Sequence, residues 1–338
     1  STICLNYQGG IKCLTCKKKE SLLKHKIKIT LKKAIKEIGG SMMFRLLKKI
    51  RKYFISNSIE MEPKRVNSDI VANDDFLKQN NHRLSSSIYG TRRLSAIESL
   101  NKASVITPPS IFLRDAYVAT GLKKKKTKIV QYGSSHLDRL NEIVKQSPKY
   151  NLSASRSLEK YSYLRFAFLG TTAPTKGLSV FCQSILALDP KIRAKCRFII
   201  YASGNTKPYQ KVVSSCSEVT FRGAYTISDL CSIINEYDIG ILPHIWYDNS
   251  PLVLLEHLNA GKFVISSKLG GVVDWLKPPE NGLLFDGGSH MQLAKCITQI
   301  VKGEVEVPSP HEIHQTFNAQ GYYDYINENI FIYQNLLE

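Results

Sequence analysis

The chain has 338 residues, of which 43% are hydrophobic and 22% are charged, and it carries a formal net charge of +19. This composition excludes an intrinsically disordered chain, and the length has room for two domains of ordinary size. The charge favours anionic partners: a nucleotide, a phospholipid surface or a nucleic acid. We find no apolar run long enough to span a bilayer and no signal peptide, and the eight scattered cysteines favour a reducing cytoplasm.

Residues 1–100 are basic and irregular, except for an amphipathic segment at 43–54. Apolar residues recur there at helical spacing among five basic residues, which predicts a helix with one apolar and one basic face. Two interpretations stay open: the helix docks on an anionic membrane surface, or its apolar face packs within the first domain. Residues 56–90 predict a long polar loop.

Three cysteines and one histidine near the N-terminus allow two interpretations: Cys4, Cys13, Cys16 and His25. They could form a zinc site, but their spacing does not fit a standard zinc finger. Free thiols in a loop are the preferred interpretation, so we predict no metal site.

The middle of the chain predicts short elements followed by a linker. Residues 104–110 predict a strand that ends in a turn, 111–121 a short helix closed by Gly121, and 128–133 another short strand. From 134 to 161 the chain is polar and has the character of a linker.

A regular alternation of strands and helices begins at residue 164. Short apolar strands are predicted at 164–170, 196–202, 219–221, 238–243, 262–266 and 282–285. Helical patterns lie between most of them, at 177–188, 227–236, 251–260 and 290–301. This alternation predicts an α/β fold with a doubly wound parallel sheet, which binds ligands beyond the carboxyl ends of its strands.

The stretch from Asp248 to Gly261 carries the clearest chemical signal. It reads DNSPLVLLEHLNAG, with seven residues between the acids Asp248 and Glu256. Ser250 suits the N-cap of a helix, Pro251 suits the first helical position, and Gly261 suits its end. A helix N-terminus can bind phosphate, and carboxylates beside it can hold sugar hydroxyls, so the stretch predicts a phosphorylated sugar ligand.

A second phosphate-type turn follows the strand at 164–170. In GTTAPTKG, Gly170 allows close approach of a ligand to the backbone, and Lys176 lies where the next helix begins. A lysine next to a helix N-terminus is a suitable diphosphate site. The signal gains force because both turns are expected at the same edge of one sheet.

These motifs, together with FIIYASGN, VTFRG, KFVISSKLGG and NGLLF, resemble in order and spacing the nucleotide-binding domain of family-4 glycosyltransferases. The resemblance covers roughly residues 160–300, and residues 105–133 resemble the end of that family's first domain. It implies the GT-B fold with two Rossmann-like domains, retention of anomeric configuration and no required metal.

The resemblance also implies roles for individual residues. Asp248 matches the candidate catalytic acid beside the donor sugar, where most relatives carry Glu, and Glu256 matches the acid that holds the donor ribose. Thr171 stands where many relatives have a phosphate-binding arginine, so one positive charge is missing. The other matched donor-binding positions are Gly170, Lys176, Arg222, Gly223, Asn249, Ser250 and Leu252, and Gly270-Gly271 matches a turn that lines the cleft. Trp246 and Tyr247 are expected to be packing residues.

Four segments follow from the resemblance. Residues 1–133 are expected to be a partial acceptor-side domain, 134–160 a linker, 161–319 the nucleotide-sugar-binding domain, and 320–338 a helix that crosses back to the first domain. Because the chain begins at Ser1 and lacks the early strands of the family, we expect an N-terminally truncated protein whose first domain is incomplete. Such a fragment is expected to bind donor weakly and to turn over poorly.

The sequence therefore predicts a hexosyltransferase that moves a sugar from a nucleoside-diphosphate sugar to a hydroxyl acceptor. No cofactor and no nucleic-acid partner are expected. The acceptor is expected to be a carbohydrate or lipid-linked molecule of cell-surface polysaccharide or glycolipid synthesis. The protein is expected in the cytoplasm, with peripheral attachment to the inner face of the membrane if the 43–54 helix docks there. The alternatives are a non-catalytic nucleotide-sugar or nucleic-acid binding protein and a GT-B-type epimerase.

Overall fold

The computed structural model describes residues 88–152, 162–317 and 321–336. It divides into two compact units, and residues 88–99 are the described part of the first. They form most of helix α4 (Ile88–Leu100), in a region that the sequence predicted to be irregular. That prediction was wrong because a basic composition conceals the helix-compatible run IYGTRRLSAIESL.

Three sequence predictions fall wholly or mostly on residues that the structure does not describe. These are the amphipathic segment 43–54, the polar loop at 56–90, and the candidate zinc ligands Cys4, Cys13, Cys16 and His25. Among the helices that are described, none has the length and apolar character needed to cross a bilayer.

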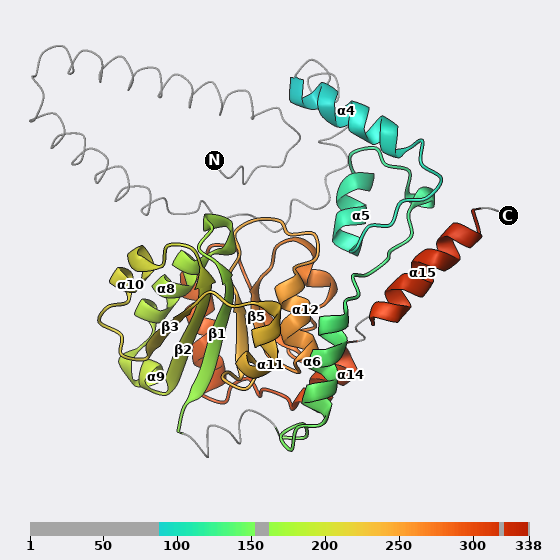
Figure 1. Cartoon of the computed structure of the whole chain (residues 1–338). Coiled ribbons are helices and arrows are strands. Elements are labelled where there is room, and N and C mark those ends of the chain that lie inside the picture. The colour runs from blue at the N-terminus through green and yellow to red at the C-terminus, as the bar shows by residue number, and fades with distance from the viewer. Residues whose placement is uncertain (1–87, 153–161, 318–320, 337–338) are drawn as a thin grey trace, which may run out of the picture. The chain divides into compact units, whose positions relative to one another are not determined.

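A six-stranded parallel sheet forms the centre of the second unit (Figure 1). The strands lie in the order β3-β2-β1-β4-β5-β6, and every neighbouring pair is parallel. Their bounds are β1 Leu164–Thr171, β2 Cys196–Ser203, β3 Val219–Gly223, β4 Ile239–Leu242, β5 Phe263–Ser267 and β6 Gly282–Phe285. The predicted α/β fold class is confirmed, because the apolar runs of the sequence become these parallel strands.

Helices cover both faces of this sheet. Crossovers between parallel strands are right-handed, and the path from β1 to β2 runs opposite to the path from β4 to β5, so their helices lie on opposite faces. Helix α13 packs on α8, while α6 and α14 pack on α12. The helices are α5 Ile111–Val118, α6 Ser135–Lys145, α8 Leu178–Ala187, α9 Pro190–Ala194, α10 Lys207–Val212, α11 Leu230–Ile233, α12 Leu252–Asn259, α13 His290–Val301, α14 Pro310–Thr316 and α15 Tyr322–Gln334.

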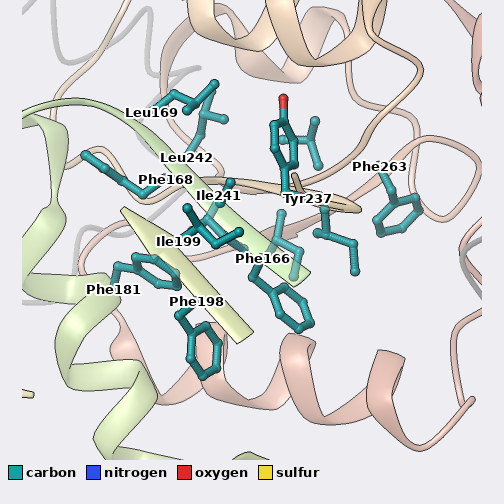
Figure 2. Close-up of a cluster of buried hydrophobic side chains, with 14 of the residues drawn as sticks. Phe166, Phe168, Leu169, Phe181, Phe198, Ile199, Tyr237, Ile241, Leu242 and Phe263 are labelled. Carbon is teal, nitrogen blue, oxygen red and sulfur yellow. The ribbon is translucent and has the colours of Figure 1, made fainter. Parts of the chain in front are cut away.

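Aromatic side chains fill the core between β1, β2 and α8 (Figure 2). The ring of Phe198 lies 5.7 Å from that of Phe166 and 5.9 Å from that of Phe181, and Phe181 also lies 6.4 Å from Phe168, measured between ring centroids. All four side chains are buried. Strands buried on both faces read as continuous apolar runs, which is why the periodicity of the sequence identified them well.

The segment from Ile106 to Val130 differs from its prediction. Instead of two strands it forms one isolated parallel bridge between Ile106 and Thr127, extended by hydrogen bonds from the N–H groups of Lys128 and Val130 to the carbonyls of Ile106 and Pro108. Consecutive prolines at 108–109 lack the N–H groups that a longer ladder requires. The predicted helix between these segments is present as α5.

The polar segment after residue 134 is not a plain linker. It contains α6, and Leu137, Leu140 and Val144 of that helix are buried in the main core. Their spacing places them on one helix face, but the polar residues between them concealed the pattern in the sequence. The domain boundaries at 133 and 160 stay a prediction.

The C-terminal helix is present as α15, and it lies beside residues 128–133. The Nζ atom of Lys128 is 3.4 Å from a carboxylate oxygen of Glu328 and 5.2 Å from the centroid of the Phe331 ring. A Cβ atom at Gly133 would overlap the carbonyl of Gly321. The assignment of 128–133 to a first domain, and of this helix as one that crosses back to it, stays a prediction.

Truncation of Phe181 tests the importance of the aromatic core. We expect Phe181→Ala to lower the free energy of unfolding by about 3–5 kcal/mol, because it removes a fully buried ring and leaves a cavity. Leu186→Ala in the same helix is the matched control, since Leu186 is exposed. Urea denaturation followed by circular dichroism measures both, and equal losses would contradict this account of the core.

Candidate functional site

Two loops meet at the carboxyl edge of the sheet, where β1 and β4 lie side by side. The chain leaves the sheet in opposite directions after these two strands, and this is the position at which doubly wound sheets bind ligands. The Ile245 N–H donates a hydrogen bond to the Thr175 carbonyl over 2.9 Å. Gly177 has a φ of +73°, and a Cβ atom there would overlap the Pro243 carbonyl. The β1–α8 loop and the β4–α12 loop are therefore packed directly on each other.

This packing brings Lys176 close to Asp248, although the two residues lie 72 positions apart in the sequence. The Lys176 Nζ lies 3.4 Å from an Asp248 carboxylate oxygen, with 41% of the lysine side chain and 16% of the aspartate side chain exposed. An ion pair exposed to this degree is a weak interaction. An anionic ligand can therefore recruit the lysine away from Asp248 at small cost.

Helix α12 begins one residue later than the sequence predicted. Its N-cap is Pro251, whereas Ser250 was expected to cap it. From its place before the cap, the Ser250 hydroxyl accepts no bond from the first turn, and among the described residues it has no hydrogen-bond partner despite being buried. Since the first bond of the helix runs from the Leu254 N–H to the Pro251 carbonyl, no helix carbonyl reaches the N–H groups of Leu252 and Val253.

The turn η5 (Gly270–Asp274) follows β5 and packs against the β4–α12 loop. The Gly271 N–H donates to the Asp248 carbonyl over 2.8 Å, and a Cβ atom at Gly271 would overlap the carbonyl of Asn249. Only glycine permits this backbone approach. On the other side of the loop, the Asn249 side-chain amide donates to the Tyr132 hydroxyl over 3.3 Å.

Glu256 lies on α12, one turn beyond its start, and is 8% exposed. One of its carboxylate oxygens, Oε1, lies 3.4 Å from Nε2 of His136 on α6. Its other oxygen, Oε2, is buried and has no hydrogen-bond partner among the described residues. A buried carboxylate oxygen without a donor is costly, so this geometry favours a hydroxyl ligand at Oε2.

His136 and Tyr132 were not identified in the sequence. Tyr132 lies in the predicted strand 128–133, and His136 lies in the segment predicted to be a linker. More than a hundred residues separate Tyr132 from Asn249 and His136 from Glu256. A single sequence contains no signal for such a distant pairing.

Other predicted residues lie at the ends of neighbouring strands. Thr171 ends β1, and its hydroxyl accepts a hydrogen bond from the Ala173 N–H over 3.2 Å. Arg222 near the end of β3 lies 3.5 Å from Glu236, with about half of its side chain exposed. Gly223 has a φ of +86°, and Gly170 lies against the Phe168 ring. The structure gives no contact that joins Arg222 or Gly223 to Lys176 and Asp248.

The aromatic residues of the β4–α12 loop behave differently from each other. Tyr247 packs as predicted, with its ring parallel to that of Phe112 at 5.9 Å between centroids and an interplanar angle of 4°. Trp246 was also expected to pack, but 49% of it is exposed. The prediction was wrong for Trp246 because the loop turns its side chain outward.

Two buried histidines support the site from within. The Nε2 of His244 lies 3.0 Å from the Leu269 carbonyl, which ties the end of β4 to the segment before η5, and burial lowers the pKa of His244. His257 lies on α12 next to Glu256, and burial lowers its pKa to about 3. Its Nδ1 is 2.7 Å from the Tyr237 hydroxyl. Within the described ranges, no group of three or more His, Cys, Asp or Glu residues could hold a metal ion.

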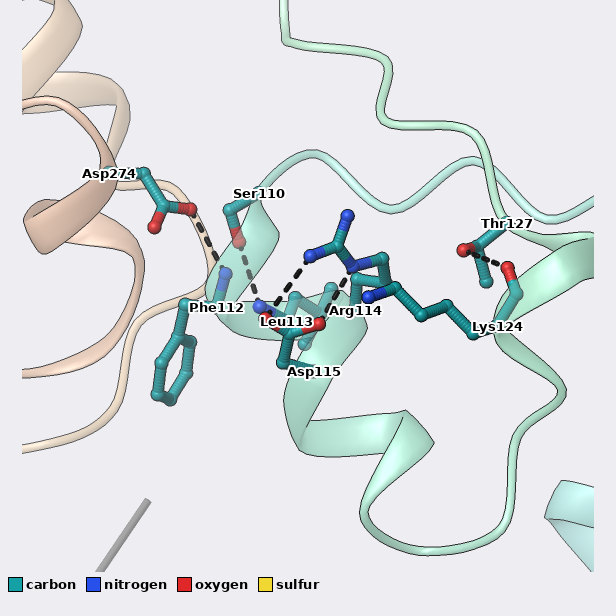
Figure 3. Close-up of polar contacts among 8 residues, drawn as sticks. All are labelled: Ser110, Phe112, Leu113, Arg114, Asp115, Lys124, Thr127 and Asp274. Atoms are coloured by element: carbon teal, nitrogen blue, oxygen red, sulfur yellow. Dashed lines mark hydrogen bonds and ion pairs between the residues drawn. The ribbon is translucent and has the colours of Figure 1, made fainter. Parts of the chain in front are cut away.

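Asp274 connects the site to helix α5 (Figure 3). Its carboxylate accepts a hydrogen bond from the Phe112 N–H over 3.0 Å, while the Ser110 hydroxyl caps the same helix by accepting from the Leu113 N–H over 3.1 Å. Burial raises the pKa of Asp274, although hydrogen bonds from the N–H groups of Phe112 and Ile111 oppose this shift. The N-terminus of α5 is therefore hydrogen-bonded to η5, the same turn that packs against the β4–α12 loop.

Part of the chain matches a known protein family in sequence. Residues 164–303 match the family described as glycosyl transferases group 1. The match begins with β1 and ends just after α13, so it contains the whole sheet and the loops at its carboxyl edge. No curated protein matches the chain in sequence.

Several solved structures share the fold at low sequence identity. HepE (Alr3699) of Anabaena in complex with UDP aligns with a TM-score of 0.57 and 18% identity, over 73% of this chain and 67% of that one. A glycosyltransferase from Rickettsia africae aligns with a TM-score of 0.53 and 14% identity, over 89% of each chain. The lipopolysaccharide outer core galactosyltransferase WaaB aligns with a TM-score of 0.55 and 16% identity, over 83% of this chain and 78% of that one.

The fold and the family match together define a class. The protein has the α/β architecture of GT-B glycosyltransferases, and residues 164–303 form a domain similar to glycosyl transferases group 1. The chain is thus glycosyltransferase-like, as its motifs predicted.

Asp274 offers a test of how α5 is held. We expect Asp274→Ala to lower the free energy of unfolding by about 1 kcal/mol, because the first N–H groups of α5 lose their acceptor. We expect Asp274→Asn to remain close to the wild type, because its side-chain carbonyl still accepts a hydrogen bond. Chemical denaturation gives the stability, and hydrogen exchange of the Phe112 amide reports on the bond itself. An equally slow amide in the alanine variant would show that Asp274 does not hold the helix.

Proposed function

We propose that this protein is a retaining, family-4-like hexosyltransferase that moves a sugar from a nucleoside-diphosphate sugar to a hydroxyl acceptor. The observation that carries the proposal is one constellation at the β1–β4 junction. Lys176 and the free N–H groups at the start of α12 provide positive charge, and Asp248 and Glu256 provide carboxylates on either side of them. A positively charged environment of this kind binds phosphate, and the neighbouring carboxylates bind sugar hydroxyls.

In the proposed mechanism the protein stabilises the departing diphosphate. Negative charge grows on that group as its bond to the sugar breaks, and we assign Lys176 and the α12 N-terminus to neutralise it. Asp248 is released from Lys176 at this stage and orients the donor sugar. We assign Gly170, Asn249, Ser250 and the Leu252 N–H to the diphosphate and sugar, and the Arg222–Gly223 backbone to the base.

The ribose is assigned to Glu256. It lies four residues beyond the free Leu252 amide, which is about 6 Å along the helix axis. Its Oε2 atom is buried and has no donor among the described residues, so a ribose hydroxyl would supply the missing hydrogen bond. Thr171 supplies no charge where the resembling family often has arginine, and Lys176 and the helix N-terminus therefore carry the electrostatic role.

Relatives in structure support a nucleotide-sugar donor. HepE of Anabaena has been solved with UDP and with UDP-glucose. Identity to HepE is 18–19%, and UDP-sugars are the first candidates to test with this protein. We propose a carbohydrate or lipid-linked acceptor, a role in cell-surface polysaccharide or glycolipid synthesis, and a cytoplasmic location with peripheral membrane attachment.

The net charge of +19 favours one competing function, a non-catalytic protein that binds nucleic acid. Such binding weakens steeply as salt is raised and shows no preference for a sugar nucleotide. A preference for one sugar nucleotide that persists at high salt would exclude this alternative. A GT-B-type epimerase would instead convert the donor sugar without any acceptor.

The donor proposal is tested by thermal shift with a panel of UDP-, GDP- and ADP-sugars. We expect one of them to stabilise the full chain, by about 2.7 kcal/mol when its concentration is a hundred times its Kd. Glu256→Ala should lose this shift, whereas Glu280→Ala should keep it, because Glu280 is exposed and lies away from the loops of the site. If no sugar nucleotide stabilises the wild type, the proposed function fails.

We further expect donor binding and sugar transfer to persist in excess EDTA, because Lys176 and the α12 N-terminus supply the positive charge that a metal ion would otherwise provide. The measurement is the thermal shift, and product formation where an acceptor is found, with and without chelator. Activity that disappears with EDTA and returns with Mg²⁺ or Mn²⁺ would contradict the metal-free assignment.

A further inference from the structure

We infer that His136 is a positioning residue that holds Glu256 for recognition of the ribose hydroxyls, and that Ser134 fixes His136 in turn. The inference rests on the proposed function and deepens it, because it names a residue from outside the matched domain that sets what the ribose site can recognise. His136 lies on α6, in the segment before β1, and residues 164–303 do not include it.

The first observation is an unusual use of a helix cap. Ser134 occupies the N-cap of α6, where a serine hydroxyl normally accepts a hydrogen bond from the first turn. Here the Ser134 side chain makes no capping hydrogen bond. Its Oγ instead lies 2.8 Å from Nδ1 of His136. The hydroxyl therefore does not cap the helix and instead hydrogen-bonds the imidazole ring.

The second observation is what the other side of the ring faces. The His136 Nε2 lies 3.4 Å from Oε1 of Glu256, and the two side chains are only 17% and 10% exposed. This approach is within ion-pair distance, while the buried His136 Nε2 makes no hydrogen bond within the described residues. In the inferred arrangement the ring N–H lies on Nε2, which faces the carboxylate, and Nδ1 accepts a hydrogen bond from the Ser134 hydroxyl.

The third observation concerns the other atoms around Glu256. The Glu256 Oε2 and the Ser250 Oγ are both buried and have no hydrogen-bond partner among the described residues. His136 engages Oε1 and leaves Oε2 as the acceptor for a ligand. Burial and then the charge of Glu256 raise the pKa of Tyr225 and of Tyr237, so both phenols stay protonated. The Tyr237 hydroxyl already contacts His257, and within the described residues neither tyrosine is a hydrogen-bond partner of Oε2.

Together these contacts form a relay from Ser134 through His136 to Glu256. Without the imidazole, the Glu256 carboxylate loses its nearest described cationic or N–H neighbour while it stays buried, and it is free to rotate away from the ligand. The loss should fall on the ribose hydroxyls alone. The diphosphate contacts of Lys176 and of the α12 N-terminus do not depend on His136.

The test compares two ligands that differ only in the ribose. Isothermal titration measures Kd for UDP and for 2′,3′-dideoxy-UDP with the full-length wild type, His136→Ala, His136→Gln and Ser134→Ala, and GDP and ADP pairs replace them if UDP does not bind. We expect the wild type to prefer the ribose form by about tenfold or more, since a hydrogen bond to a charged group is worth that much. His136→Ala should bring this ratio close to one, chiefly by weakening UDP, while His136→Gln and Ser134→Ala should lie between.

The control is His290→Ala at the start of α13, which should keep the wild-type ratio. A general loss of folding in His136→Ala would weaken both ligands alike and leave the ratio unchanged, so the ratio separates positioning from stability. If the wild type prefers the ribose form and His136→Ala keeps that preference, the inference is overturned and the proposed function stands. If no nucleoside diphosphate binds the wild type, both are overturned.

Discussion

The pairing of β1 with β4 in the middle of the sheet is the constraint on which the candidate site depends. It brings together two loops that follow strands far apart in the sequence, and Gly177 allows their backbones to approach to contact distance, while Gly271 allows η5 to approach the second loop. Neither loop could keep its shape alone, because each uses carbonyl and N–H groups of the other or of η5 as partners. The ion pair between Lys176 and Asp248 follows from this packing and does not cause it.

The buried acid on α12 sets a second constraint. Five neighbours of Glu256 along the helix are buried: Leu254, Leu255, His257, Leu258 and Asn259. A carboxylate in such surroundings must have donors, yet the Nε2 of His136 only approaches one oxygen to 3.4 Å, and the other oxygen has no hydrogen-bond partner within the described residues. This is a stability cost that is hard to explain by packing, and it is the strongest structural reason to regard α12 as part of a binding site.

The order and type of the elements after residue 164 could be predicted because each central strand is a short apolar run bounded by polar residues or glycine. The same logic failed where composition was ambiguous. The three apolar residues of α6 are scattered among charges, and Pro108 and Pro109 interrupt what otherwise resembled a strand. Both Ser250 and Pro251 indicate a helix start at α12, and in the structure Pro251 is the N-cap residue.

The residues of the site divide in the same way. Lys176, Asp248 and Glu256 could be proposed from local sequence because each lies in a recognisable turn or helix start. His136 and Tyr132 could not, since their role arises from contacts across more than a hundred residues. The role of Ser134 was concealed more completely, because a serine before a helix predicts a cap, whereas in the structure its hydroxyl contacts His136.

The neighbourhood of Lys176 and Asp248 also bears on selectivity among anions. Since the lysine is already paired with a carboxylate, its field is partly cancelled before any ligand arrives. Inorganic phosphate would have to displace Asp248 without offering it a new partner. A ligand that offers a hydroxyl to the displaced aspartate as well as a phosphate to the lysine compensates both groups at once. Because the exposed pair is weak, the proposed donor would gain only a small advantage over a bare phosphate from this exchange.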